Sequence, residues 1–173
     1  DDATKGCTHG PEGLDKRDES LLIDAAGGVA ITGGPATLET ADFTVEIAPD
    51  ASEQTVLTGT ATGSSRLEGK LPARPGESEP RIFTLTSPDG LKLERSVRGW
   101  RVIESTHVDV ALEGPDGFTA RADRVHDFVV PESASGALEP GGLRFMAEGA
   151  VAAEFANGRF GGEELEVLAL EPV

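Results

Sequence analysis

The histidines are the residues of this 173-residue chain best suited to chemistry, and two of the three lie in strand-like sequence. His107 and Asp109 are two residues apart, a spacing that puts both side chains on one face of a strand. An imidazole and a carboxylate can both bind zinc, but a zinc site needs three or four such ligands. We therefore expect His107 to be solvent-facing or capped by a neighbour, and we predict no metal site.

The sequence carries none of the common catalytic motifs. It has no nucleophile elbow, no phosphate-binding loop, no dinucleotide-binding fingerprint and no zinc pattern. Cys7, the only cysteine, lies in a polar leader with no evident base to activate it. The acidic residues are spread along the whole chain, so that pairing two of them as acid and base would be arbitrary. These observations predict a protein that is not an enzyme and that uses no cofactor.

The charge balance excludes several kinds of partner. The formal net charge is −16, which repels the phosphates of nucleic acids and opposes docking to anionic lipid headgroups. No stretch approaches the run of about 20 apolar residues that a membrane span needs. We therefore expect no nucleic-acid partner and no membrane span in this chain. The acidity is explained by a soluble, acid-rich surface or, alternatively, by a partner with a basic face.

Composition and patterning point to an all-β fold. With 22 glycines and 11 prolines, the chain has the turn chemistry of many short strands. Residues 1–20 are polar and predict a flexible arm, whereas residues 21–173 predict a single β domain built from repeats. A Pro-rich loop is expected at about 70–80. After it, two strands are expected around a tight turn at 88–90.

The clearest strand, at 37–47, alternates apolar and polar residues. Ala41 falls on its apolar face and Asp42 on its wet face. A related stretch recurs at 110–123, where Val-Ala, a glycine and a final Ala-Asp reappear in the same order, and a weaker third copy begins at Val151. Because one hairpin cannot bury its own apolar face, such units must stack. The repeat predicts a β-jellyroll or β-roll of two facing antiparallel sheets, with a β-solenoid as the alternative.

The two copies differ at one informative place. Superposing them puts Arg124 and His126 opposite Phe43 and Val45, so basic side chains stand where apolar ones are expected. One interpretation is a β-bulge that shifts the alternation and turns Val125 inward. The other is a polar opening in the inner wall that holds the headgroup of a ligand. In both interpretations we expect the repeated Asp42 to have a structural role.

Residues 27–47 with 57–61, and residues 108–128 with 147–151, resemble the OstA-like repeat of the periplasmic lipopolysaccharide-transport proteins LptA and LptC and of the N-terminal part of LptD. The resemblance implies a β-jellyroll, open along one side, that holds the acyl chains of lipopolysaccharide between its sheets. It also implies end-to-end association with itself or with other jellyroll proteins. The expected location is the periplasm or cell envelope, with any signal or anchor lying outside this chain.

The resemblance further implies that inward-facing side chains contact the lipid. We assign this role to the apolar face of the first copy, to large apolar residues elsewhere and to the two basic residues where the copies differ. The candidate ligand-binding residues are Phe43, Val45, Ile47, Phe118, Arg124, His126, Phe128, Phe145 and Phe155. The alternative function is that of a non-catalytic structural or assembly scaffold made of stacked β-repeats.

Overall fold

The computed structural model describes residues 21–33, 36–47, 55–71, 73, 76–96, 99–114, 116–131 and 143–168. The arm predicted at 1–20 lies outside them. The described residues form nine strands and no helix, which confirms the all-β, jellyroll-like class. The strands are β1 Leu21–Gly33, β2 Ala36–Ile47, β3 Thr55–Leu71, β4 Arg81–Ser87, β5 Gly90–Ser96, β6 Gly99–Leu112, β7 Phe118–Pro131, β8 Arg144–Phe155 and β9 Gly158–Leu168.

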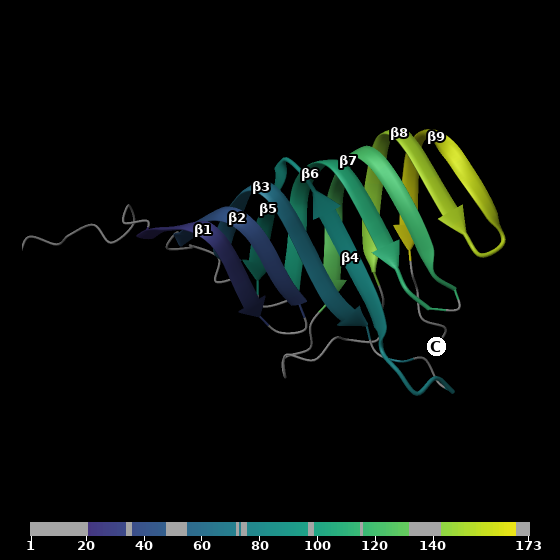
Figure 1. The fold of residues 1–173 in the computed structure, drawn as a ribbon, viewed down its shortest axis with the longest axis horizontal. Helices are drawn as coiled ribbons and strands as arrows, with labels where there is room; N and C mark the ends of the chain where they lie inside the picture. Colours follow the sequence, from purple (N-terminus) through teal and green to yellow (C-terminus); the bar gives the residue numbers. More distant parts are fainter. Residues whose placement is uncertain are drawn as a thin grey trace, which may run out of the picture.

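The strands form one continuous sheet in the order β1-β2-β3-β4-β6-β7-β8-β9, with β5 also pairing with β3 and β6. Every pairing is antiparallel, as in a jellyroll and unlike the parallel coils of a β-helix solenoid. Figure 1 shows the sheet running from β1 (purple) at one end to β9 (yellow) at the other. Each strand pairs with the strand that follows it in the sequence, except that β4 does not pair with β5.

A crease crosses the sheet and folds it into two facing halves. Register shifts interrupt the ladders of β1–β2, β2–β3, β7–β8 and β8–β9 at corresponding places. Positive φ angles mark the same line at Gly28, Gly63, His107 and Gly149. Since a bulge bends its strand, aligned bulges bend the whole sheet, and the long strands arch over in Figure 1. The two facing layers that were predicted are therefore halves of one sheet, and each long strand contributes to both.

The two strands predicted around 88–90 exist, but they do not form a hairpin. β4 pairs with one half of β3 and β6, and β5 pairs with the other half. The two strands therefore lie end to end, and Pro88 and Asp89 form a corner on the crease. Gly90 continues the corner at φ +101°, and a Cβ built on it would lie 2.1 Å from the carbonyl oxygen of Ala61. Of the Pro-rich loop predicted at about 70–80, Lys70 and Leu71 belong to β3, and the described residues 73 and 76–80 lie between β3 and β4.

The inner faces of the two halves form one hydrophobic core. In the half that contains β4, one row of partners crosses the sheet as Ile31, Leu38, Leu67, Leu85, Val110, Ala120 and Ala153. Aromatic rings bridge the halves: the centroid of Phe83 lies 5.7 Å from that of Phe128, and the centroid of Phe118 lies 5.9 Å from that of Phe145. These contacts close the interior between β4 and β8.

Buried hydroxyl groups line part of the crease on the inner side. They belong to Thr40, Ser65, Ser87 and Ser105. The hydroxyl of Ser65 donates to the carbonyl of Gly63 at 2.9 Å, and that of Ser105 donates to the carbonyl of Gly90 at 2.9 Å. A bulge leaves backbone groups without ladder partners, and a buried carbonyl without a partner is costly. Short hydroxyl side chains therefore allow the sheet to bend without losing hydrogen bonds.

The crease also corrects one expectation about the repeat. Ala41 was predicted to face the core, but it is exposed. The bulge between Thr40 and Asp42 turns Thr40 inward instead, at 6% exposure. Asp42 is exposed, as predicted, and its Oδ1 accepts a hydrogen bond of 3.2 Å from the backbone N–H of Gly27 on β1. The repeated Ala-Asp therefore marks the crease, and Asp42 holds the bulge of the neighbouring strand.

Candidate functional site

Most of the apolar candidate residues lie inside the folded sheet. Phe43, Phe118, Phe128 and Phe145 are buried, and Val45 and Ile47 are half-buried. Phe155, at the end of β8, is 37% exposed, although its ring centroid lies 5.8 Å from that of Phe118. The fold therefore divides the predicted lipid-contacting residues into a packed centre and partly uncovered positions near the ends.

Arg124 and His126 lie on the outer face of the sheet. The register of β7 against β8 shifts between Arg121 and Arg124, and Val125 is turned inward with 1% exposure. Of the two interpretations drawn from the repeat, the β-bulge is confirmed, and the polar opening of the inner wall is wrong. The physical reason is that a bulge adds one residue to the alternation, which exchanges the inward and outward positions after it.

The two basic side chains take part in an ionic network across three strands. Arg124 lies 3.2 Å from Glu104 on β6 through Nε, and 3.1 Å from Glu148 on β8 through Nη1. His126 places Nε2 at 3.1 Å from Glu148 and Nδ1 at 2.9 Å from Asp127. The network joins Glu104 of β6, Arg124 and His126 of β7, and Glu148 of β8, so it acts as a clamp between the three strands.

This network changes the protonation of its members. Hydrogen bonding to Asp127, and next to Glu148, raises the pKa of His126 above its usual range. The pKa of Asp127 is lowered, first by its hydrogen bond from Arg101 and then by His126. Because the carboxylates are more than a third exposed, solvent screens these interactions and each one stabilises the fold only modestly.

His107 and Asp109 bind different partners. His107 is exposed, with a φ of +49°, and its Nδ1 forms a hydrogen bond with Oδ2 of Asp89 at the corner. This bond raises the pKa of His107. Asp109 instead accepts a hydrogen bond of 2.7 Å from Nε of Arg121. Within the described residues, no group of three or more histidine, cysteine or acidic side chains could hold a metal ion.

The interior is less completely covered at the β1 end than at its centre. Ile23 on the edge strand is 48% exposed. The partly buried side chains that pack against the core at this end are Val29, Ile31, Val45 and Leu57. Phe43 is the only phenylalanine of β1, β2 and β3, and its ring lies over Gly59. Phe43 and Val45 were among the predicted residues, whereas sequence reasoning missed Ile23, Val29, Ile31 and Leu57, although their place in the first strands of a stack could have indicated them.

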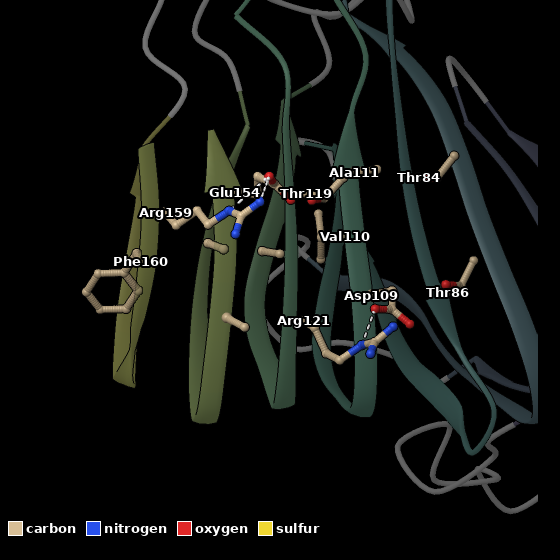
Figure 2. Close-up of a pocket in the computed structure, with 13 residues that line it drawn as sticks. Thr84, Thr86, Asp109, Val110, Ala111, Thr119, Arg121, Glu154, Arg159 and Phe160 are labelled. Atoms are coloured by element: carbon tan, nitrogen blue, oxygen red, sulfur yellow. Dashed lines mark hydrogen bonds and ion pairs between the residues drawn. The ribbon is translucent and has the colours of Figure 1, made fainter. Parts of the chain in front are cut away.

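A second surface feature lies on the opposite side of the strands. An outward-facing hollow of about 650 Å³ crosses β4, β6, β7, β8 and β9 (Figure 2). It is flanked by two ion pairs, Arg121 with Asp109 and Arg159 with Glu154. Sequence reasoning did not find it, because residues at alternate positions of five strands resemble an ordinary solvated face until the register brings them together.

The fold and these surfaces define an all-β domain of the jellyroll-like class. Its described residues contain no helix long and apolar enough to span a membrane. Comparisons of the chain with protein-family models, with curated proteins and with solved structures find no match. The function must therefore be argued from the chemistry of the interior and of the outer faces.

Proposed function

We propose that this domain is a cell-envelope lipid-binding module of the lipopolysaccharide-transport kind, which holds acyl chains between the facing halves of its sheet. The observation that carries the proposal is the set of half-covered apolar side chains at the β1 end, around Ile23, Val45 and Leu57. The OstA-like repeat resemblance supports it, and so does the continuous apolar core that the inner face of the sheet forms.

The proposal places the lipid at the β1 end because the centre is already filled. Between β4 and β8, Phe83, Phe128 and Phe145 are fully buried; Phe83 contacts Phe128 across the two halves, and Phe128 stacks on Phe145. An acyl chain there would have to displace well-packed rings, and overpacking a core is destabilising. At the β1 end, each methylene moved from water onto apolar side chains contributes about 0.8 kcal/mol.

The headgroup must lie outside the sheet. With Arg124 and His126 on the outer face and already paired with carboxylates, these two residues do not form an inner headgroup site. The net charge of −16 also opposes close approach of phosphates. The proposed interaction is therefore with the acyl chains, and a phosphorylated headgroup stays in solvent or on a partner protein.

Site-specific photo-crosslinking tests the proposal with a matched pair of adjacent positions. A photoreactive amino acid at Val45 faces the interior, whereas the same group at Thr44 faces outward, where the Thr44 hydroxyl donates to Asp24 at 2.7 Å. We expect lipopolysaccharide, and a fluorescent fatty acid such as cis-parinaric acid, to label position 45 and not position 44. Equal labelling at the two positions, or no labelling at either, would overturn the proposal.

A structural or assembly module is the second candidate, and the two sheet edges favour it. Among the described strands, β1 and β9 each pair on one side only, so both present unpaired backbone groups. Exposed Ile23 and Leu168 lie on these two strands. Unpaired edges template pairing with another chain. Sedimentation that depends on protein concentration, in a protein that takes up no lipid, would support this function over lipid binding.

A further inference from the structure

The outward hollow is built by two neighbouring rows of the sheet. Antiparallel register aligns Thr84, Ala111, Thr119, Glu154 and Arg159 in one row, and Thr86, Asp109, Arg121 and Ala152 in the next. The intervening Leu85, Val110 and Ala120 are buried, so alternation turns both rows to the outside. The volume of about 650 Å³ falls in the range of small-ligand sites, roughly 300–1,000 Å³.

The shape follows from side-chain size. Ala111, Thr119 and Ala152 are short and form the floor. The longer pairs of Arg121 with Asp109 and of Arg159 with Glu154 stand above it at opposite corners in Figure 2. Such a floor is wide and shallow, so it fits a flat molecule that lies along the sheet rather than a side chain that is inserted into a hole.

The charges around the hollow cancel. Its two arginines each pair with one carboxylate, at 2.7 Å for Arg121 and 3.0 Å for Arg159. The hollow is thus locally neutral on a chain whose net charge is −16. An anionic ligand would have to displace a carboxylate and approach an acidic protein. A cationic ligand would be attracted more strongly to the acidic surface elsewhere, so the charge balance selects a neutral ligand.

The polar groups require a ligand with many hydroxyls. Asp109 uses Oδ1 for its arginine, and Glu154 uses Oε1 for its own, so the second oxygen of each carboxylate can accept another bond. The hydroxyl of Thr119 both donates and accepts. An apolar ligand would bury these groups without partners, at a cost in affinity. A sugar hydroxyl donates and accepts at once, and it can bridge an ion pair without breaking it.

We infer that this hollow binds a neutral oligosaccharide, lying flat across β6, β7 and β8 between the two ion pairs. The site is on the opposite face of the strands from the proposed lipid-binding interior, so each can fail without the other. It would allow the domain to contact an uncharged glycan while its interior remains available.

Ligand-observed NMR with three neutral probes, cellotetraose, maltotetraose and N-acetylchitotetraose, tests this site. Sialyllactose serves as the anionic comparison. Thr119→Gln adds a longer side chain to the floor without changing charge, and Thr60→Gln makes the same change at an exposed position of β3, on the outer face of the other half. We expect at least one neutral probe to bind. Thr119→Gln should weaken that binding by at least about tenfold, and Thr60→Gln should leave it unchanged.

Three outcomes would overturn the inference: no signal from any neutral probe, stronger binding of sialyllactose, or equal effects of the two glutamine variants. Should Thr119→Gln fail to fold, judged by its urea unfolding curve, Arg121→Gln tests the same site. It removes the donors of one ion pair from an exposed position, and we expect a similar loss of binding.

Discussion

Replacing Gly90 by alanine tests the corner that joins β4 and β5. The φ of +101° lies where a side chain is strained, and the added Cβ would lie 2.1 Å from the carbonyl oxygen of Ala61 on β3. Gly28, on the same crease in β1, has a similar φ of +87° but no atom within 4 Å of an added Cβ. Gly28→Ala therefore carries the backbone strain alone, and the difference between the two variants isolates the collision.

The magnitudes follow from these two terms. The left-handed backbone costs about 1–2 kcal/mol for a residue with a Cβ, which is the loss of unfolding free energy expected for Gly28→Ala. Gly90→Ala must also push β5 away from β3, for a total of about 3–5 kcal/mol. Urea unfolding at equilibrium measures both, and the melting temperature of Gly90→Ala should fall by roughly 10 °C. Equal destabilisation by the two substitutions would refute the corner as the reason for a glycine at position 90.

Two further predictions concern the crease hydroxyls and the ionic network. Ser65→Ala removes the hydroxyl that bonds to Thr40 and Gly63, and should lower the unfolding free energy by about 1–2 kcal/mol, whereas Ser64→Ala at an exposed position should change it by less than about 0.5 kcal/mol. The raised pKa of His126 means that its charged form stabilises the fold fully below its ordinary value of 6.5, and that this stability is lost as the pH rises through the raised pKa. The urea midpoint should therefore fall as the pH rises above about 6.5, and His126→Gln should flatten that fall; an unchanged slope would contradict the role of the network.

Alternation in the sequence predicted the inward positions well where the ladder is regular. It placed Phe43 inside, and Phe43 is 5% exposed. The same alternation wrongly placed Ala41, two residues earlier, inside. The bulge at the crease adds a residue between Thr40 and Asp42, so that Ala41 faces outward. At Val125 a β-bulge was one of two open interpretations. The sequence shows that the alternation is interrupted, but it does not show where in the sheet the extra residue is accommodated.

The Ala-Asp pair that ends both copies of the repeat has a structural role at the crease. From the sequence, this aspartate was expected only to keep the outer face of the strand soluble. In the structure it lies on the crease, where the Asp42 carboxylate accepts a hydrogen bond from the backbone N–H of Gly27 in the bulge of β1. In the second copy, Asp123 lies at the crease against Gly149, within 3 Å of where a Cβ on that glycine would be. The repeated aspartate therefore accompanies a glycine on the neighbouring strand in both copies.

The amino-acid sequence by itself determined the all-β class, the approximate extents of most strands, the acidic surface and the set of apolar residues available for a core. These follow from period-two patterning and turn chemistry, which act over a few residues. Only the tertiary structure decided that one creased sheet supplies both facing layers, that five strands form the outer hollow and that Arg124 and His126 face outward. These features depend on register between strands far apart in the chain, and a shift of one residue there exchanges the two faces of a strand.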